Sequence, residues 1–367
     1  MTVIIQIFIL VRKELLALVK EPSSRAMLLA PVFLQSLLFG YGATFDLTHA
    51  PYAVLDQSRG RASTDIVARL EGTGVFHRVA TLTSTEQIPD YIDSGKVLMV
   101  VSFPSDFQSR VVTGTGAPMQ LILDGRNSST AGLASSYVSN IVNSYNQELF
   151  PHVQGISIER RSWYNPNLQS RWNMMPAMIG AISMLQTLLI AALSVARERE
   201  QGTFDQLLVT PLTPLQILIG KAIPAILVGL VQSTIIFLII RYWFQIPMNG
   251  SVLLLYCGLF FFTIASVGIG LSISALSLTM QQAMLYTFMI IMPLMLLSGL
   301  MTSVENMPEV LQIATYVNPL RFGIDIVRRV YLEDAGFTDV AANFIPLVVL
   351  AAITLPLAAW LFRHRLS

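Results

Sequence analysis

The sequence predicts a polytopic α-helical membrane protein with an α/β domain inserted after its first span. Of its 367 residues, 53% are hydrophobic and only 12% are charged, whereas a soluble domain is about one quarter charged. Apolar segments long enough to cross a hydrocarbon core recur along the chain. Charges return in one continuous region, 46–171, where β-rich and helical stretches alternate, and this alternation is typical of a compact α/β domain.

The totals argue against several functional classes. A net charge of +1 gives no bulk attraction to nucleic acid. Cys257 is the single cysteine and the four histidines are scattered, so no metal site is predicted. Gly220-Lys221 is followed by Ala222, and Leu215 stands where a phosphate-binding loop needs its first glycine. We therefore expect no ATP hydrolysis by that route, no bound cofactor and no catalytic residues.

Residues 1–25 are predicted to form a cytoplasmic amphipathic helix at the membrane interface. The apolar run Val3–Val11 is followed by Arg12, Lys13, Glu14 and Lys20, and Pro22 ends the segment. Cations in such a helix lie near lipid headgroups. The alternative is a signal peptide with Ala26–Ala43 as its apolar region. Arg25 directly precedes that long run and favours a membrane span.

Six transmembrane helices are predicted, one before the charged region and five within 172–367. They are Ala26–Phe45 (the first span, 26–45), Trp172–Ala196, Ala222–Ile240, Ser251–Leu278, Gln281–Met301 and Ala341–Phe362. None of them contains Asp, Glu, Lys, Arg or His. Ion-coupled carriers usually hold such a group inside the membrane, so we expect the energy source on another chain.

The region 46–171 is expected to alternate strands with helices. Expected strands are Tyr52–Leu55, Phe76–Ala80, Val97–Phe103 and Met119–Leu123, and expected helices are Thr64–Leu70, Thr85–Ser94 and Ala131–Phe150. Asp124-Gly125-Arg126-Asn127 is interpreted as a turn, with a ligand site as the alternative.

The distribution of Lys and Arg predicts the orientation. Nine lie in short flanks on the side of both termini and four on the other. The positive-inside rule therefore places both termini in the cytoplasm and the α/β domain outside, in the periplasm if the cell has two membranes.

The connector 197–221 is a polar island between two spans and must lie at one membrane face. Its alternating charges, Arg197, Glu198, Arg199 and Glu200, suit reversible docking of another protein. The alternative is an ordinary solvated loop. Between the fifth and sixth spans, 302–332 is expected to form two short helices that break at Asn318-Pro319 and dip partly into the membrane, where protein must bury them.

Some uncharged residues in the spans suggest a substrate path. The candidates are Gln186, Thr187, Gln232, Met284, Phe288 and Met292. The alternatives are hydrogen bonds between helices for the polar residues and core or lipid contact for the apolar ones.

Several motifs resemble known sequences. Arg-Glu-Arg-Glu-x-Gly-Thr at 197–203, Leu207-Leu208, Thr210-Pro211 and Gly220-Lys221 resemble the hallmark of type-2 ABC transporter permeases, the membrane subunits of ABC exporters. Segments 121–128, 163–168 and 304–308 are similar to the YbhR/YbhS/YhhJ-type permeases of the bacterial inner membrane.

This resemblance implies a non-catalytic transport subunit. Such permeases form homodimers or pair with a sibling permease, engage a cytoplasmic subunit that binds ATP and Mg²⁺, and sometimes work with a periplasmic adaptor protein. The implied ATPase-coupling residues are Arg197, Glu198, Arg199, Glu200, Gly202, Thr203, Asp205, Gln206 and Lys221. The implied external gate, in re-entrant helices, comprises Glu305, Asn306, Pro308, Asn318 and Pro319.

The function predicted from residues and resemblance together is outward movement of apolar or amphipathic compounds, including drugs, by alternating access. Two alternatives stay open at this point. One is a membrane-anchored sensor or assembly scaffold whose external domain binds a partner, and the other is an ion-coupled antiporter. The sequence does not identify the substrate.

Overall fold

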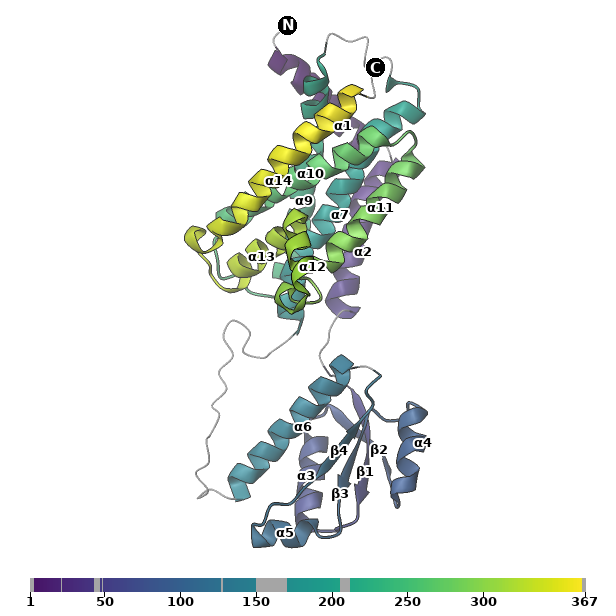
Figure 1. The fold of residues 1–367 in the computed structure, drawn as a ribbon, viewed down its shortest axis with the longest axis vertical. Helices are drawn as coiled ribbons and strands as arrows, with labels where there is room; N and C mark the ends of the chain where they lie inside the picture. Colours follow the sequence, from purple (N-terminus) through teal and green to yellow (C-terminus); the bar gives the residue numbers. More distant parts are fainter. Residues whose placement is uncertain are drawn as a thin grey trace. The chain divides into compact units, whose positions relative to one another are not determined.

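The computed structural model describes residues 3–20, 22–42, 47, 49–126, 128–149, 170–204 and 212–364. The chain divides into two compact units (Figure 1). Met1–Thr44 and Ser162–Ser367 form the helical unit, and Phe45–Arg161 forms the α/β unit. Each is described by itself.

The α/β unit is built on a four-stranded sheet with the order β2-β1-β3-β4. The strands are β1 (Ala50–Asp56), β2 (Phe76–Thr81), β3 (Met99–Phe103) and β4 (Gln120–Leu123). β1 pairs in parallel with β2 and β3, and β4 is antiparallel to β3. The two central strands are nearly continuous apolar runs because helices cover both faces of the sheet.

Helices lie on both sides of this sheet (Figure 1). They are α3 (Arg61–Gly72), η1 (Thr85–Gln87), α4 (Ile88–Asp93), α5 (Phe107–Thr113) and α6 (Ser128–Leu149). Tyr52 and Val54 pack with the core beneath α3 and α6, whereas Ala53 and Leu55 pack with Ile88 of α4, as the alternation of side chains along a strand requires.

The observed strands overlap the four expected from the sequence, and α5 was not expected. Arg126 N donates to Asp124 Oδ1 at 3.1 Å, so the segment after β4 forms a turn closed by its own aspartate. Asn127 lies outside the described residues. The position of this unit outside the membrane stays a prediction.

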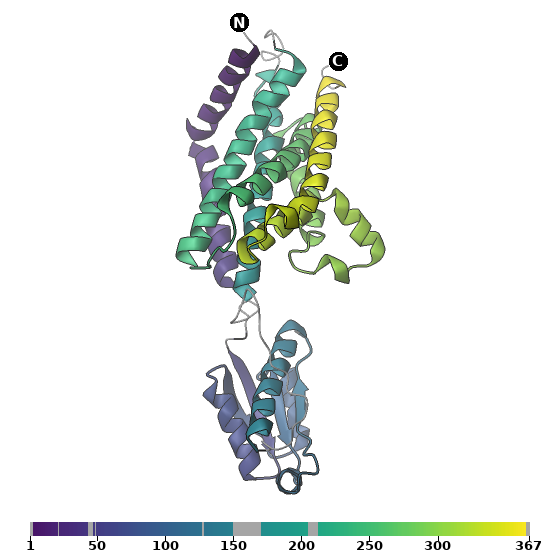
Figure 2. The same cartoon turned by 90° about the vertical axis from the view of Figure 1, so that its left-hand side faces the viewer.

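The helical unit consists of packed helices connected mainly by short segments. They are α1 (Val3–Lys20), α2 (Pro22–Gly42), α7 (Ser170–Glu200), α9 (Pro214–Leu238) continued by a π-turn (Ile239–Trp243), α10 (Val252–Leu276), α11 (Met280–Leu296), α12 (Glu309–Ala314), α13 (Pro319–Leu332) and α14 (Phe337–His364), with 3₁₀ turns at Val304–Asn306 and Thr315–Val317. α7 is central, since it contacts α2, α9, α10, α11 and α13. In Figure 2, α1 and α2 run along one flank of α9.

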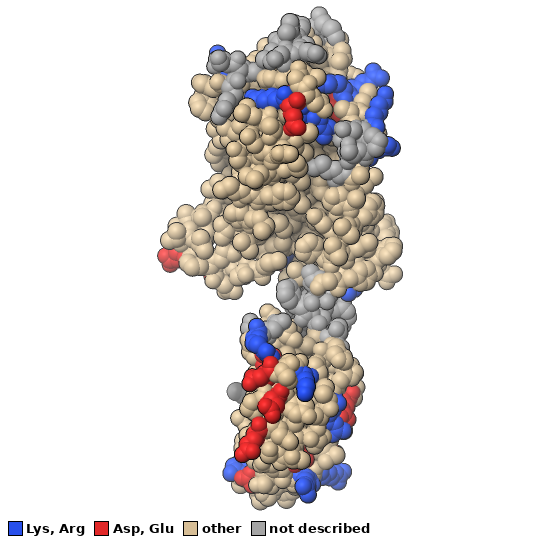
Figure 3. All heavy atoms as spheres, turned by 90° about the vertical axis from the view of Figure 1, so that its right-hand side faces the viewer, with Lys and Arg blue, Asp and Glu red and all other residues tan. Residues whose placement is uncertain are grey.

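Among the described residues, four helices are long and apolar enough to cross a membrane: Arg171–Glu200, Pro214–Trp243, Val252–Leu276 and Phe337–His364. Leu28–Gly42 and Met280–Leu296 are shorter apolar helices. On the face in Figure 3, Lys and Arg of the helical unit gather mostly towards one end, above a broad uncharged band. Six spans therefore stay a prediction, with four supported by length.

Both ends of the connector 197–221 are helical, whereas the sequence predicted a loop over the whole segment. α7 continues to Glu200, and α9 begins at Pro214 behind a capping box formed by Thr213 and Gln216. Lys221 therefore lies inside α9, whereas the sequence placed it before a span. Residues 205–211, which include the predicted coupling residues Asp205 and Gln206, lie outside the described residues.

Candidate functional site

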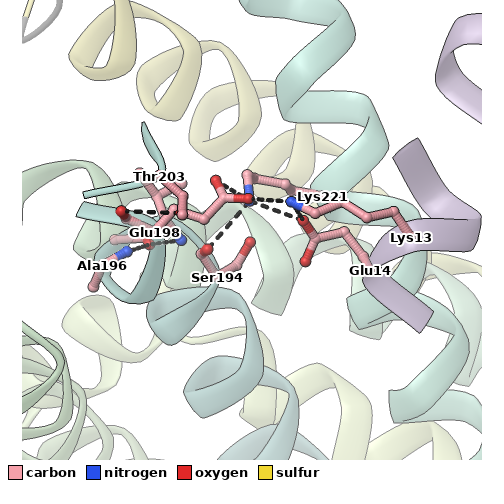
Figure 4. A network of polar contacts seen from close by, with 9 residues as sticks. Lys13, Glu14, Ser194, Ala196, Glu198, Thr203 and Lys221 are labelled. Carbon is pink, nitrogen blue, oxygen red and sulfur yellow. Dashed lines mark hydrogen bonds and ion pairs between the residues drawn. The ribbon is translucent and has the colours of Figure 1, made fainter. Parts of the chain in front are cut away.

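Four charged side chains from three helices meet at the end of α7. We call Lys13, Glu14, Glu198 and Lys221 the charge cluster. Lys221 Nζ lies 2.8 Å from Glu198 Oε2 and 3.2 Å from Glu14 Oε1, and Lys13 Nζ lies 2.6 Å from Glu198 Oε1. Figure 4 shows the side chains of α1 pointing towards Lys221 and Glu198. The cluster joins α1, α7 and α9.

The charge cluster is buried at its centre and open at one edge. The side chains of Lys221 and Glu198 are 1% and 9% exposed, whereas that of Lys13 is 53% exposed. Lys221 Nζ also donates to Ser194 O at 3.2 Å. Buried ions are tolerated when they are paired and hydrogen-bonded, and loss of one partner leaves the other uncompensated. The two buried charges therefore depend on each other.

The pKa of Lys13 is raised by its neighbours in the charge cluster. Burial by itself would lower the pKa of the Lys13 ammonium, but the hydrogen bond to Glu198 and the charge of Glu14 outweigh burial and raise this pKa above its ordinary value. Lys13 therefore stays protonated at neutral pH.

A close helix contact supports the charge cluster. A Cβ atom at Gly220 would lie 2.3 Å from Leu10 Cδ2, so only glycine lets α1 approach α9 this closely. Leu10 is the buried residue of α1. Gly220 and Lys221 are adjacent, and together they dock α1 through one apolar and one ionic contact.

Arg199 and Glu200 hold the turn between α10 and α11. Arg199 Nη1 donates to Ala275 O and to Ser277 O, each at 3.1 Å. Glu200 Oε2 accepts from Met280 N, the first residue of α11, at 2.7 Å. A cation at a helix C-terminus and an anion at an N-terminus both complement the helix dipoles and the unpaired backbone groups.

The turn after α7 has a backbone that requires glycine. Thr203 N donates to Glu198 O at 3.0 Å and Gly202 N to Arg199 O at 3.1 Å, which is the Schellman pattern of a helix end. Gly202 has φ +67°, a conformation that glycine adopts without strain. Phe204 then packs on Phe362 of α14 and beneath Arg199.

The described coupling residues fall into three groups by their exposure. Glu198 and Lys221 are buried, so they are not presented on the surface as the sequence suggested. Glu200, Gly202 and Thr203 are exposed. Arg197 and Arg199 are half-buried. A direct contact with a partner stays a prediction, and the exposed turn at 200–203 is the part of the described residues that offers it.

The structure places the predicted substrate-path residues in two places. Gln186, Thr187 and Gln232 are buried between helices, where Gln232 Nε2 donates to Leu28 O at 3.2 Å. Phe288 and Met292 are 52% and 63% exposed on α11. Met284 is half-buried on α11. Gln232 thus joins α9 to α2, whereas Gln186 Oε1 and Thr187 Oγ1 have no hydrogen-bond partner among the described residues. The structure does not bring the six residues to one path.

The predicted gate residues are similarly divided. Glu305, Asn306 and Pro308 are exposed around the 3₁₀ turn, whereas Asn318 and Pro319 are buried. Asn318 Nδ2 donates to Leu294 O at 2.7 Å and its Oδ1 accepts from Leu320 N. Asn318 therefore caps α13 and ties it to the end of α11, and a gating role stays a prediction.

The sequence reasoning missed the part that α1 plays. Leu10, Lys13 and Glu14 were assigned only to an interfacial helix, yet they dock α1 on α7 and α9. The apolar run followed by charges predicted the helix but carried no signal for partners about 200 residues away.

Comparison with known proteins gives consistent matches. A family model described as "ABC-2 family transporter protein" matches residues 23–360. The chain is 43% identical over 363 residues to "Probable multidrug ABC transporter permease YbhR" of Escherichia coli strain K12, covering 98% of this chain and 99% of that protein. It is 27% identical over 369 residues to "Probable multidrug ABC transporter permease YbhS" and 28% identical over 375 residues to "Inner membrane transport permease YhhJ" of the same strain, covering at least 95% of every chain.

Proposed function

The chain belongs to the ABC-2 family of transporter proteins, and from this premise we propose that it is the transmembrane permease of an ATP-driven exporter. It is a non-catalytic permease subunit, and ATP is hydrolysed by a separate subunit of the transporter. The names of YbhR and YbhS refer to multidrug transport. These names and the apolar spans support apolar or amphipathic compounds, including drugs, as the exported class.

The arrangement at the end of α7 is the observation that carries this proposal. The turn 200–203 is exposed. Glu198, just before the turn, binds α1 and α9, and Arg199 together with Glu200, the first residue of the turn, binds the α10–α11 turn. A partner that displaces this turn would therefore move several helices together. A packed bundle passes such a displacement on by hinge or shear movement.

The same proposal includes the location and the partners. The permease lies in the bacterial inner membrane, as the name of YhhJ says of that relative, with six spans, both termini in the cytoplasm and the α/β unit outside. It works as a homodimer or with a sibling permease, and the α/β unit is available to a periplasmic adaptor. The positive-inside count of Lys and Arg supports the orientation.

Affinity purification with a bulky substitution tests the coupling surface. The chain is purified from its native membranes, and co-purifying ATP-binding proteins are identified by mass spectrometry. Gln201→Trp places a large side chain on the exposed turn without touching the charge cluster. Thr338→Trp is the matched control, because Thr338 is also exposed but lies at the start of α14.

We expect the wild type and Thr338→Trp to retain an ATP-binding subunit and Gln201→Trp to lose it. Retention by all three would show that the turn is not the docking surface. Absence of any ATP-binding protein from the wild type would contradict the exporter proposal itself.

A further inference from the structure

A polar cleft lies where the end of α11 meets α13. It has a volume of about 560 Å³, and its walls include the turn after α11, one face of α13, and Asn343 of α14. This volume is within the range of small-molecule sites, about 300–1,000 Å³. The function proposed above does not involve this cleft.

Two arginines supply positive charge to the cleft. Arg321 and Arg328 lie seven residues apart on α13 and so share one face of the helix. Arg328 donates to Gly299 O at 3.0 Å and Leu300 O at 3.2 Å, and its Nε is buried without a partner among the described residues. Arg321 Nη1 donates to Gln312 O at 3.2 Å and to Thr315 Oγ1, and its guanidinium lies over the ring of Tyr316. A guanidinium has five N–H donors, so each arginine keeps donors for an anionic oxygen beyond these contacts.

The cleft also contains acidic groups, and these differ in how they are engaged. Asp325 Oδ2 accepts from Asn343 Nδ2 at 2.5 Å and lies 4.0 Å from Arg329. Glu305 is exposed, and its carboxylate has no hydrogen bond or ion pair within the described part of the chain. The cleft therefore offers guanidinium donors for an anion and one free carboxylate for a cation.

An exposed apolar stripe on α11 leads towards the cleft. Leu285, Met289, Met292 and Leu296 are exposed and follow the spacing of one helix face. Leu296 ends α11, and Ser298 is the first residue after it that lines the cleft. At 1.5 Å per residue the stripe is about 17 Å long. A long apolar surface that ends in a polar cleft has the layout of an amphiphile.

We propose that this cleft binds the headgroup of a zwitterionic phospholipid, phosphatidylethanolamine, with an acyl chain along α11. The phosphate is held by the guanidinium groups of Arg321 and Arg328, and the ammonium by Glu305. The ammonium N–H groups donate charge-assisted hydrogen bonds to a carboxylate. Phosphatidylcholine has no N–H to donate, and phosphatidylglycerol has no cation, so neither satisfies both ends of the cleft.

Native mass spectrometry of the purified full chain tests this without nucleotide or partner, so its result is independent of ATPase coupling. The chain is titrated with phosphatidylethanolamine, phosphatidylglycerol and phosphatidylcholine of identical acyl chains. We expect phosphatidylethanolamine to bind about tenfold tighter than the other two, which is the effect of one charge-assisted hydrogen bond. Equal binding of the three lipids would overturn the proposal.

Single substitutions separate the two ends of the headgroup. Glu305→Gln should reduce phosphatidylethanolamine binding to the level of phosphatidylcholine, and Arg321→Gln should weaken all three phospholipids. Glu309→Gln is the matched control, because Glu309 is an exposed glutamate of α12 outside the cleft lining. A loss of preference in the Glu309→Gln protein equal to that in Glu305→Gln would contradict the assigned site.

The free headgroup distinguishes a lipid from a soluble ligand of the same chemistry. Glycerophosphoethanolamine carries the phosphate and ammonium but no acyl chain. If the stripe on α11 contributes, this compound should compete only at concentrations far above those of the lipid. Competition at equal concentrations would show that the ligand is a soluble phosphoethanolamine and not a membrane lipid.

Discussion

The charge cluster of the helical unit and the ion pairs on the α/β unit both join a basic side chain to a carboxylate at similar distances. Lys221 lies 2.8 Å from Glu198, and Arg69 of α3 lies 2.5 Å from Glu148 of α6. The surroundings differ sharply, since the Lys221 side chain is 1% exposed, whereas those of Arg69 and Glu148 are 35% and 63% exposed.

This comparison indicates that burial, and not the distance between the charges, determines how much an ion pair contributes to stability. Water replaces a lost partner at the surface of the α/β unit, so each charge there is nearly independent of the other. Lys221 is buried inside the helical unit, so water does not take its place when it is removed. Glu198 and Glu14 then lose their ion pairs with Lys221. The cluster therefore fixes how α1, α7 and α9 fit together, while the surface pairs leave the position of α3 and α6 to their apolar contacts.

The largest effect should come from Lys221→Met, which removes the buried cation and leaves two carboxylates near one remaining lysine. Breaking a buried pair in this way costs about 3–5 kcal/mol. We expect the variant in detergent to unfold at a clearly lower SDS concentration than the wild type. Adding Glu198→Gln should restore much of the loss, because it removes the uncompensated charge. A Lys221→Met protein as stable as the double variant would show that the cluster is not effectively buried.

A smaller effect should follow from Gly220→Val, which leaves every charge in place. The new Cβ would clash with Leu10 Cδ2, and overpacking costs about 1–3 kcal/mol. We expect faster hydrogen exchange in α1 and little change in α10. Leu10→Ala in the same chain should recover part of the protection, whereas no recovery would mean that Gly220 serves another purpose.

Features set by local sequence were predictable, and features set by distant pairs were not. Short β-rich runs between turn residues predicted segments that overlap all four strands of the α/β unit. Asn318-Pro319 correctly marked a break, because a proline and its capping residue act within one turn. The partner of Glu198 on α1 was not predicted, since Lys13 and Glu198 are 185 residues apart. Glu198 and Lys221 were predicted to lie in a loop because charged residues usually mark the solvated ends of spans. In the structure they lie within α7 and α9, where they form a buried ion pair.

Asp56 at the end of β1 is an intermediate case, a partly exposed carboxylate with several neutral donors. Its oxygens accept from Ser58 N, Ser58 Oγ, Arg59 N and Ser63 Oγ at 2.7–3.0 Å. Burial raises the pKa of Asp56, but the hydrogen bonds from Ser63, Ser58 and Arg59 outweigh it and hold this pKa below its ordinary value. The stabilisation is therefore complete above about pH 4 and is lost as pH falls through the lowered pKa.

Asp56→Asn should accordingly destabilise the α/β unit at neutral pH by about 1 kcal/mol, since water recovers part of the lost bonding. Hydrogen exchange of β1 and α3 in the intact chain, corrected for intrinsic rates, measures this at pH 6.5 and pH 3. The gap between wild type and variant should narrow in acid. A gap that is equal at both pH values would mean that the carboxylate charge contributes nothing.

The smallest effect should come from Arg69→Ala, although Arg69 Nη1 and Nη2 both donate to Glu148, at 2.9 and 2.5 Å. These bonds lower the pKa of Glu148, yet both groups reach water, which solvates either one when the other is removed. We expect hydrogen-exchange rates in α3 and α6 of Arg69→Ala to match the wild type within error, and the same result for Glu148→Ala.

The salt concentration gives a second test of the role of burial. Raising it should leave the stability difference between Lys221→Met and the wild type unchanged, because screening acts on exposed charges. A strong loss of protection in Arg69→Ala would mean that geometry, rather than burial, decides the value of an ion pair in this protein.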